Sequence, residues 1–381
     1  MLREGLLYKM KKLTTVLIII YIFLFIQNVY ADFNLSYDIN RGLIDRKYKL
    51  DNYKEQLFIP EFQVKGIYIT GWTAGSPRME DLIQLVENSI INTMVIDIKD
   101  QDGYLSYYSN IPLAKEIGAN KRKIKNIRGL IDRLQKKGIY TIARIAVFKD
   151  VILSRKKEEF ALQLYDTEIK EVYKSKNWVD PSIKEVWDYN IGLAREAAGI
   201  GFDEIQLDYI RYPALGEGTL QALTPENKTK SSYINEFIKY SRSQLSDLNV
   251  PLSIDVFGLT TTVRDDLGIG QNFTELSSII DIISPMIYPS HYSEGVYGLE
   301  IPEAEPYKVI YRSLSDAKEK INGKDHINIR PWLQDFTMEH KYTYKEVLEQ
   351  IRAVENLGIK EWLLWNPSSR YTEEALRDNR F

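Results

Sequence analysis

The 381-residue sequence predicts an α/β protein, a (β/α)8 TIM barrel with long strand-to-helix loops at its C-terminal face. Eight short apolar runs alternate with amphipathic helical segments, a pattern typical of a parallel sheet. Eight strands also close such a barrel, and about 320 residues suffice for one with insertions. The helix-to-strand connections are short and the strand-to-helix connections long, which gathers the long loops at one end. The alternative is a doubly wound open sheet, which the absence of a glycine-rich loop after the first strand disfavours.

The predicted strands follow one another after Pro60. They are the apolar runs at residues 64–70, 93–99, 140–148, 203–210, 251–257, 282–288, 327–333 and 361–366. Helical spacing of apolar residues predicts helices at 78–88, 126–137, 182–198, 226–248, 307–321 and 343–357. The fifth connection has room only for a short helix, at 273–278. The long loops are 100–125, 149–181, 211–225 and 288–306.

The N-terminus has the pattern of an export signal. Four basic residues (Arg3, Lys9, Lys11 and Lys12) precede an apolar run from Leu13 to Ile26, and Ala31 supplies a small residue for cleavage. We therefore expect residues 1–31 to be a signal peptide, residues 32–60 a linker or N-terminal strap, and residues 61–381 the barrel. Export would place the barrel in the periplasm, the cell envelope or the extracellular space. The alternative for 1–31 is an uncleaved anchor that tethers the protein to a membrane.

Composition excludes several classes of function. The net charge is −3 and no basic block follows the N-terminus, so a nucleic-acid partner is not predicted. The chain has no cysteine, which excludes disulfides, thiolate metal sites and a cysteine nucleophile. With only 3 histidines, a histidine-rich metal centre is not expected, and no cofactor is predicted. The sequence does not indicate an oligomeric state.

Charged residues interrupt the predicted strands on the side that faces the barrel interior. In the strand 203–210, Ile205 and Leu207 share one parity, so Gln206 and Asp208 point inward. The same alternation directs inward Asp97 and Lys99, Arg144, and Asp255 of the neighbouring strands. A buried ion-pair network is the structural explanation. Four strands that break the apolar pattern near the same end favour a functional site.

Paired carboxylates without histidine suggest the hydrolysis of glycosidic bonds. One carboxylate attacks or stabilises the sugar centre, and a second carboxyl group protonates the leaving oxygen. Asp208 and Asp255 lie on neighbouring strands, which run about 4.8 Å apart, and are the candidate catalytic pair. Alternation does not give their distance, so a retaining and an inverting outcome both remain open.

Further polar and aromatic residues follow the strands and suit a sugar-binding cleft, because aromatic faces pack on pyranose rings. Asp335 is also a rival acid or base. In addition to Asp97, Lys99 and Arg144, the candidate substrate-binding residues are Trp72, Tyr209, Arg211, Tyr288, His291, Trp332, Gln334, Asp335 and Trp365.

The segment DIKDQDG, residues 97–103, has a second interpretation. Asp97, Asp100 and Asp102 resemble a loop that binds a hard cation, although no Glu occupies the twelfth position of the EF-hand pattern. A turn closed by Asp102 and Gly103 is the simpler explanation. No metal site is predicted; a metal-dependent hydrolase remains an alternative that a chelator would inhibit.

A series of motifs resembles the putative glycoside hydrolase family DUF4015. In order they are TGWTAG, VIDIKDQDG, IARIAVFKD, WVDPSIKEVWDYN, GFDEIQLDYIRYP, SIDVFG, ISPMIYPSHY and IRPWLQDF, and they extend from about residue 64 to about residue 370. The resemblance implies a (β/α)8 barrel of the α-amylase-like glycosidase class. It also implies that Asp208 is the nucleophile, with Tyr209 and Arg211 beside it. The sequence departs from that class on the fifth strand, where Asp255 replaces the glutamate that serves as acid.

Two functions are therefore weighed. The first is an exported glycoside hydrolase that cleaves a polysaccharide through Asp208 and Asp255. The second is a carbohydrate-binding or envelope-structural barrel without catalytic activity, which would retain Tyr288, Trp332 and Trp365. A separation of more than roughly 10 Å between the two carboxyl groups would favour the second.

Overall fold

A computed structural model describes residues 62–216, 218–225, 228–321 and 328–377. The contacts divide the chain into two units, Met1–Leu57 and Phe58–Phe381, and all described residues belong to the second. The predicted signal or anchor at 1–31 and strap at 32–60 lie outside the described residues. No helix in the described part of the chain is long and apolar enough to span a membrane.

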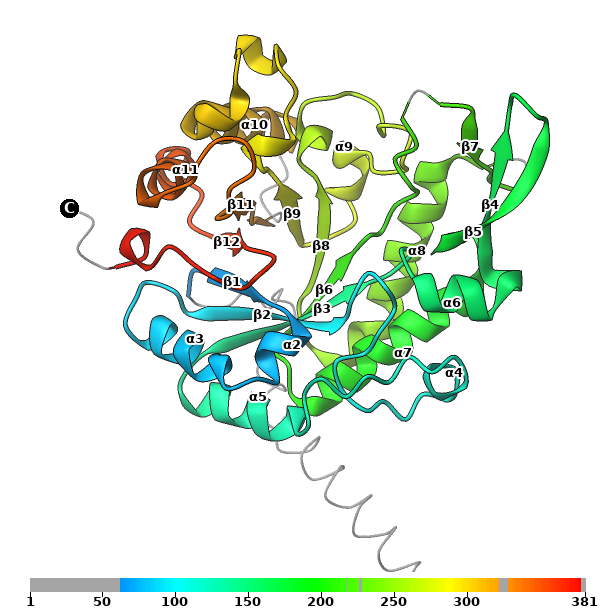
Figure 1. Ribbon diagram of the computed structural model, residues 1–381, viewed down its shortest axis with the longest axis horizontal. Helices are drawn as coiled ribbons and strands as arrows, with labels where there is room; N and C mark the ends of the chain where they lie inside the picture. The colour runs from blue at the N-terminus through cyan, green and yellow to red at the C-terminus, as the bar shows by residue number, and fades with distance from the viewer. Residues whose placement is uncertain (1–61, 217, 226–227, 322–327, 378–381) are drawn as a thin grey trace, which may run out of the picture. The chain divides into compact units, whose positions relative to one another are not determined.

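Eight parallel strand positions form a closed barrel, as the sequence predicts (Figure 1). Strand β9 pairs with β8 on one side and with β10 and β11 on the other, and β12 pairs with β1, which closes the sheet. The seventh position is split into β10 and β11 around Arg330 and Pro331, because proline has no N–H for the sheet. The barrel strands are β1 (Lys65–Ile69), β2 (Thr93–Lys99), β3 (Tyr140–Ala146), β6 (Glu204–Asp208), β8 (Leu252–Phe257), β9 (Ile282–Met286), β10 (Asn328–Ile329), β11 (Trp332–Gln334) and β12 (Trp362–Trp365).

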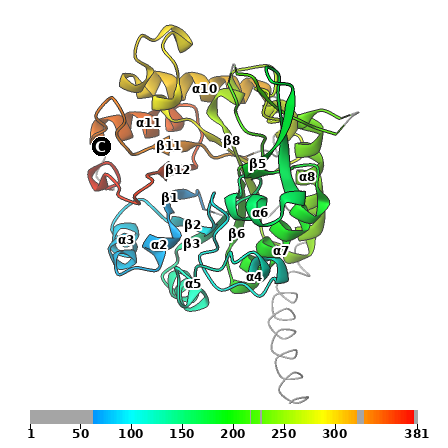
Figure 2. The same ribbon diagram turned by 45° about the vertical axis from the view of Figure 1, so that its right-hand side comes forward.

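Helices surround the barrel (Figures 1 and 2), and each of the predicted ones is present with its ends shifted by a few residues. They are α3 (Arg78–Glu87), α5 (Ile127–Lys136), α7 (Lys184–Ile200), α8 (Lys230–Leu245), α9 (Phe273–Leu276), α10 (Pro306–Lys320) and α11 (Tyr344–Asn356). Side-chain caps begin several of them; Thr343 and Glu346, for example, form a capping box at α11. The short helices are α2 (Gly71–Ala74), α4 (Pro112–Glu116), α6 (Val151–Lys156) and the 3₁₀ helices η1 (Glu158–Phe160), η2 (Ser246–Leu248), η3 (Gly258–Thr261), η4 (Pro289–His291), η5 (Val296–Gly298), η6 (Pro302–Ala304) and η7 (Glu373–Ala375).

The segment predicted as the long loop 149–181 contains regular structure. After α6, β4 (Ala161–Asp166) and β5 (Glu171–Val179) form an antiparallel hairpin, and β7 (Leu220–Ala222) joins its edge. The hairpin extends away from the barrel beside α6 and α8 (Figures 1 and 2). Most of β5 is exposed and polar, and only the first two residues of β4 are buried, so neither strand has the apolar run by which the barrel strands are recognised.

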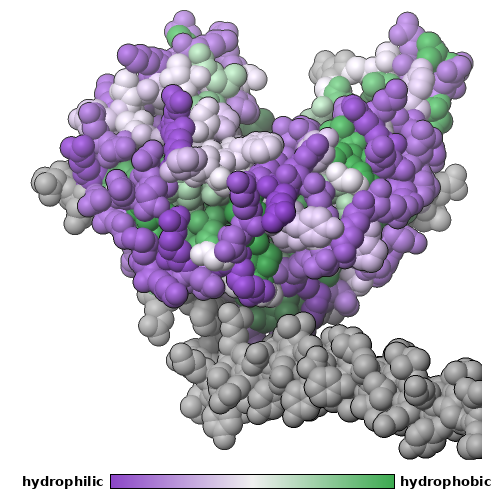
Figure 3. All heavy atoms as spheres, turned by 60° about the horizontal axis from the view of Figure 1, so that its bottom comes forward, coloured by the Kyte–Doolittle hydropathy of each residue, from purple (hydrophilic) through white to green (hydrophobic). Residues whose placement is uncertain are grey.

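The barrel strands direct alternate side chains to two different cores. Apolar residues of one parity pack against the helices, whereas Tyr68, Val95, Ile142, Trp332 and Leu363 fill the barrel interior. The surface shown in Figure 3 is largely hydrophilic, with apolar side chains in smaller patches.

A charged cluster occupies the N-terminal end of the barrel interior. Arg330 donates to both carboxylate oxygens of Glu204, at 2.7 and 2.9 Å, and to Glu361 at 2.8 Å. Ser253 donates a further hydrogen bond to Glu204 at 2.6 Å. These contacts pair the buried charges, as burial requires, although Arg330 Nη2 has no hydrogen-bond partner among the described residues. We call Glu204, Arg330 and Glu361 the basal cluster.

Candidate active site

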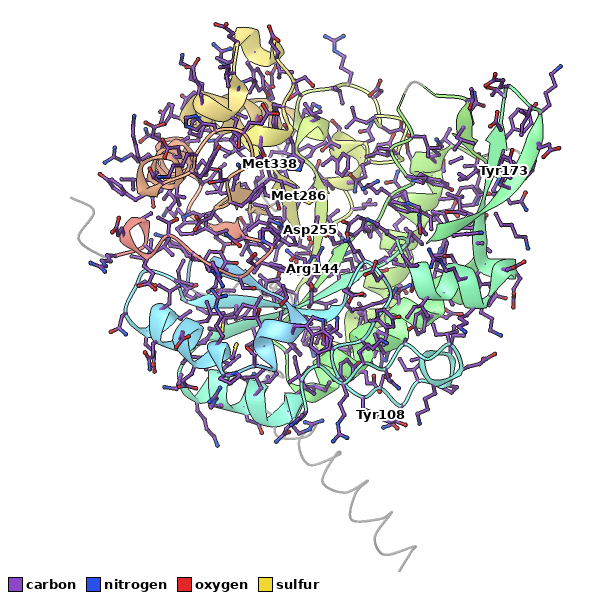
Figure 4. All side chains as sticks on the ribbon, in the orientation of Figure 1. Tyr108, Arg144, Tyr173, Asp255, Met286 and Met338 are labelled. Carbon is purple, nitrogen blue, oxygen red and sulfur yellow. The ribbon has the colours of Figure 1, made fainter. Side chains whose placement is uncertain are left out.

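A second charged cluster lies at the C-terminal end of the barrel, where the long loops begin. Arg144 of β3 donates from Nη1 to Asp97 of β2 at 2.6 Å and from Nε to Asp208 of β6 at 3.1 Å. Its Nη2 also pairs with Asp208, and its Nε lies 3.9 Å from Asp255 of β8. Arg144 and Asp255 are near the centre of the ring of strands in Figure 4. The alternation predicts inward side chains for these four residues. In the structure they lie together, with the three aspartates around the guanidinium of Arg144. We call them the mouth cluster.

Asp208 is held at the last residue of β6. Its main-chain oxygen accepts a hydrogen bond from Val147 N at 2.8 Å, which fixes it to the end of β3. Oδ2 accepts from Arg144, and Oδ1 accepts from the backbone N–H of Tyr209 at 2.5 Å. The chain turns at Tyr209, whose φ is +51°, a left-handed conformation that is unfavourable for a bulky residue. Asp208 therefore has a hydrogen-bond donor at each of its two carboxylate oxygens.

Asp255 has a different environment. Its Oδ1 accepts one hydrogen bond, from Trp332 Nε1 at 2.8 Å, and its Oδ2 has no hydrogen-bond partner among the described residues. Burial, together with the nearby charge of Asp208, raises the pKa of Asp255 well above its ordinary value. The two carboxyl groups therefore differ in their surroundings: Asp208 has a donor at each oxygen, whereas Asp255 has one donor and a raised pKa.

The two carboxyl groups also lie close to each other. Because Oδ2 of Asp208 is 3.1 Å and Oδ2 of Asp255 is 3.9 Å from the same nitrogen of Arg144, these two oxygens are separated by at most about 7 Å. This is below the roughly 10 Å that would have favoured a barrel without catalytic activity. Retaining and inverting pairs both fall within this limit, so both outcomes stay open.

Asp97 is held in the mouth cluster by two donors. Besides Arg144, Tyr68 donates to it from its hydroxyl group at 2.5 Å. Burial nevertheless raises the pKa of Asp97. Trp365 stacks on Tyr68, with ring centroids 3.8 Å apart, and lies over the Arg144 guanidinium at 5.0 Å. Asp97 thus orients Arg144, and Trp365 covers it.

An open pocket of about 590 Å³ adjoins the mouth cluster on the side of β9, β11 and β12. Tyr288, Trp365, His291 and Phe336 line it, together with loop residues that include Asn366 and Arg370. Burial lowers the pKa of His291, whose Nδ1 lies 3.0 Å from Ser290 Oγ. Of the residues predicted to bind substrate, Tyr288, His291 and Trp365 therefore line one pocket next to the carboxylates.

Tyr209 and Arg211 belong to an aromatic group at the end of β6. The Arg211 guanidinium lies 4.8 Å from the ring centroid of Trp178, 5.3 Å from that of Tyr209 and 4.3 Å from that of Phe257. Lys149 Nζ lies 5.1 Å from the Tyr209 ring. Tyr209 and Arg211 therefore turn over the site, although their strand parity alone points them toward the helices.

Lys99 does not point into the mouth, contrary to the prediction. The register of β2 shifts between Asp97 and Lys99, so an irregularity reverses the alternation. Lys99 Nζ instead forms an ion pair with Asp150 at 2.7 Å and donates to Asn190 of α7 at 3.0 Å. Its role is structural.

Two more candidates, Gln334 and Asp335, are held by contacts outside the mouth cluster. Gln334 is fully buried and connects loops through Glu303, Ser290 and Phe336. Both carboxylate oxygens of Asp335 accept hydrogen bonds from Thr372, at 2.7 and 2.8 Å, and burial raises the pKa of Asp335.

Trp72 and Trp332, two of the residues predicted to bind substrate, differ in exposure. Trp72 on α2 is 65% exposed, with Lys123 Nζ 5.6 Å from its ring centroid. Trp332 is 1% exposed, so it positions Asp255 through its indole N–H and has no free face for a sugar.

The three aspartates of DIKDQDG are not gathered into one site. Asp97 faces Arg144, whereas Asp100 pairs with Lys123 at 2.5 Å and accepts the N–H of Asp102. The N–H of Gly103 closes the turn on Asp100 O, at 2.9 Å. Within the described ranges, no three Asp, Glu, His or Cys side chains are arranged to hold a metal ion.

Sequence reasoning did not identify several residues of the mouth. Tyr68 was recognisable by its inward parity on β1, but an aromatic residue there resembles ordinary filling of the barrel. Trp178 and Lys149 gave no local signal, because the β5 hairpin brings them to the end of β6 only in the folded chain.

The comparisons with known proteins agree with this geometry. The family model DUF4015, described as "Putative glycosyl hydrolase domain", matches residues 66–371. The glycoside hydrolase domain of PgaB (BpsB) from Bordetella bronchiseptica is similar over 83% of this chain and 98% of its own, with 13% identity and a TM-score of 0.62. The C-terminal domain of a putative chitinase from Desulfitobacterium hafniense DCB-2 is similar over 82% of this chain and 97% of its own, with 11% identity and a TM-score of 0.54. At such identities the likeness establishes the fold alone.

One solved structure is closer in sequence. A hypothetical protein from Ruminiclostridium thermocellum ATCC 27405 has 39% identity over 53% of this chain and 98% of its own, with a TM-score of 0.45. No curated protein matches the sequence.

Proposed function

Because the chain belongs to DUF4015, the family of the putative glycosyl hydrolase domain, we propose that it is an exported hydrolase that cleaves the glycosidic bonds of a polysaccharide with Asp208 and Asp255. One observation carries the assignment of these residues. The two carboxyl groups share Arg144 at the barrel mouth, but Asp208 has donors at both oxygens, whereas Asp255 has one donor and a raised pKa.

Asp255 is the general acid in this proposal. Its burial and the charge of Asp208 keep the proton on the carboxyl group at a pH where an exposed aspartate has lost it. The Trp332 indole N–H fixes one oxygen, so the other is free to donate to the leaving glycosidic oxygen.

Asp208 is the nucleophile or base. The Arg144 guanidinium and the Tyr209 N–H stabilise its negative charge and fix its orientation. In a retaining reaction, Asp208 attacks the anomeric carbon and forms a glycosyl-enzyme ester, which water then hydrolyses. In an inverting reaction, it instead removes a proton from the attacking water.

The pocket beside the mouth cluster supplies binding surface for the sugar chain. Its aromatic side chains, Tyr288, Trp365 and Phe336, present faces and edges for pyranose rings. His291 and Asn366 supply polar groups for hydroxyls. The substrate is therefore a polysaccharide or oligosaccharide that crosses the mouth of the barrel.

Export is supported by the N-terminal sequence alone, through its basic start, apolar run and Ala31. We place the barrel in the periplasm, the cell envelope or the extracellular space. If residues 1–31 stay attached, they tether the enzyme to the membrane.

The test is hydrolysis of a panel of polysaccharides by the purified protein, with Asp208→Asn and Asp335→Asn as variants. We expect Asp208→Asn to lower kcat by about a thousandfold or more, since removal of a catalytic nucleophile typically costs that much. Asp335→Asn should retain activity, because Thr372 occupies both oxygens of Asp335. Thermal unfolding of each variant separates a catalytic loss from misfolding.

Equal activity of the wild type and Asp208→Asn would remove Asp208 from the mechanism. Binding of a glycan without any hydrolysis would instead support a carbohydrate-binding or envelope-structural barrel. That alternative rests on the low exposure of Asp208, 3%, and of Asp255, 1%, which also suits a purely structural ion cluster.

A further inference from the structure

Arg211 differs from the other buried cations of the described chain. Five lysine or arginine residues are buried, namely Lys99, Lys123, Arg144, Arg211 and Arg330. Four of them form ion pairs with carboxylates at 2.8 Å or less. Arg211 forms none with a described residue, although it is only 8% exposed. Burial lowers the pKa of Arg211, and the charge of Asp208 offsets this only in part. A buried cation without a contacting counter-ion is costly, so it suits a partner from outside the chain.

The known contacts of Arg211 leave most of its donors unused. One hydrogen bond from Nη1 to Tyr212 O, at 2.9 Å, is its only one among the described residues. The rings of Trp178, Tyr209 and Phe257 surround the guanidinium and hold it in place. A guanidinium fixed in this way presents a planar fork of N–H groups, the geometry that binds a carboxylate through two parallel hydrogen bonds.

A second cation stands beside the first. Lys149 Nζ lies over the Tyr209 ring, and its one hydrogen bond is to Gln101 Oε1 at 3.2 Å. It too forms no ion pair with a described carboxylate. Burial, and then the charge of Arg211, lower the pKa of Lys149, and the charges of Asp102 and Asp208 offset part of this repulsion between the two cations. An anion placed between them would remove that repulsion.

We propose that Arg211 and Lys149 form an anion subsite that binds a carboxylate carried by the sugar next to the scissile bond, so that the substrate is an acidic glycan. The inference rests on the proposed function and specifies its substrate class. The subsite adjoins the end of β6, where Asp208 lies one residue before Tyr209. Arg211 and Lys149 do not line the aromatic pocket of Tyr288 and Trp365, whose lining has His291 and Arg370 but no aspartate or glutamate.

The carboxylate has two chemical sources: the ring carboxylate of a uronic acid, or that of an ether substituent such as the lactyl group of N-acetylmuramic acid. The probes are therefore galacturonate oligomers, glucuronate-bearing xylan oligomers and N-acetylmuramate-containing glycan strands. Each is paired with its carboxyl-reduced form, which keeps the linkages and removes the charge.

The experiment measures Kd for each pair with the purified full chain, by affinity electrophoresis and calorimetry. It compares the wild type with Arg211→Gln and Lys149→Gln. We expect a carboxylated probe to bind about tenfold or more tightly than its reduced form, since a hydrogen-bonded charge pair contributes that much. Arg211→Gln should abolish the preference, and Arg211→Lys should restore it only in part. Added salt should weaken the preference in the wild type.

Lys184→Gln is the matched control. Lys184 begins α7 and lies over the rings of Trp187, on the same helix, and Tyr240, on α8, and it is not part of the mouth cluster. It should leave the preference unchanged. Lys149 is half-buried, so Lys149→Gln keeps the test informative if Arg211→Gln does not fold.

The outcomes separate this inference from the proposed function. If no carboxylated probe binds more tightly than its reduced form, or if Arg211→Gln and Lys149→Gln keep the preference, the anion subsite is refuted. Hydrolysis of a neutral glycan would then still support the hydrolase. A carboxylate preference that depends on Arg211, without hydrolysis of any probe, would support the subsite and refute the hydrolase.

Discussion

Asp208 and Asp255 show how two aspartates acquire different properties around one arginine. Asp208 receives donors on both oxygens, whereas Asp255 has one donor, from Trp332, and an oxygen without a partner among the described residues. Burial raises the pKa of Asp255 because nothing around it fully replaces water. The number of donors, and not distance from Arg144 alone, therefore distinguishes the surroundings of the two aspartates.

The raised pKa of Asp255 predicts a specific dependence of stability on pH. Between the unfolded pKa, about 3.9, and the raised folded pKa, the folded protein holds a proton that the unfolded chain has lost. The contribution of Asp255 to stability is thus complete below the unfolded pKa and is lost as pH rises through the folded pKa. We expect Asp255→Asn to gain stability relative to the wild type as pH rises from about 4 to 8, measured by urea unfolding.

Asp247→Asn is the contrasting control. Asp247 is exposed, and its hydrogen bonds with Arg195 lower its pKa. Its contribution is present above the unfolded pKa and disappears as pH falls, so the sign is opposite to that of Asp255. Parallel stability curves for the wild type and Asp255→Asn would show that the pKa of Asp255 is not raised.

Sequence alternation identified the mouth cluster, because parity on a barrel strand fixes which face a side chain takes. It gave Asp97, Arg144, Asp208 and Asp255 correctly as inward residues. It was wrong for Lys99, since one irregularity in β2 reverses parity and leaves no mark in the sequence. Inward charge alone also does not define a site: the basal cluster has the same character at the closed end of the barrel.

At the scale of elements, the end of β2 is connected to α7 through Lys99. This side chain donates to Ala146 O at 2.9 Å and to Asn190 at 3.0 Å, and pairs with Asp150. Asp150 in turn caps α6 by accepting Leu153 N at 2.7 Å. One cation thus joins two barrel strands and two helices next to Asp208.

Substitution of this cation should destabilise the protein strongly. Lys99→Met leaves the Asp150 carboxylate buried without its partner, and we expect a loss of about 3–5 kcal/mol in the free energy of unfolding. Lys137→Met is the comparison, because Lys137 and Glu87 form a partly exposed pair at 2.5 Å that should contribute less than about 1 kcal/mol. Urea unfolding measures both, and similar losses would contradict a special role for Lys99.

Elements with an apolar face were predictable, and those without one were not. The barrel strands and the long helices follow from their periodicity, because each packs one side against a core. The hairpin of β4 and β5 buries little and carries charged residues along β5, so its strands leave no pattern. Its importance for the site, through Trp178, appears only when the chain is folded.

At the scale of the whole barrel, closure depends on residues that are far apart in the chain. Strand β1 begins at Lys65 and pairs with β12, which ends at Trp365. All eight strand positions therefore lie within the second unit, Phe58–Phe381.

A chain that begins at Phe58 should fold independently, because it contains every strand that closes the barrel. We expect its circular dichroism spectrum and cooperative thermal unfolding to match those of the barrel in the full-length protein, with Tm within a few degrees. A chain that remains unfolded, or that melts much earlier, would show that residues 1–57 contribute to the fold.

The basal cluster has a consequence for how relatives of this protein diverge. Its members come from three places in the chain: Glu204 on β6, Arg330 between β10 and β11, and Glu361 before β12. Loss of any one leaves a charge that no solvent reaches. Substitutions at these positions should therefore be inherited together, so that a relative with an apolar residue at 330 also lacks acidic residues at 204 and 361. Helix-facing positions of the same strands, which exchange one apolar side chain for another, should vary independently of each other.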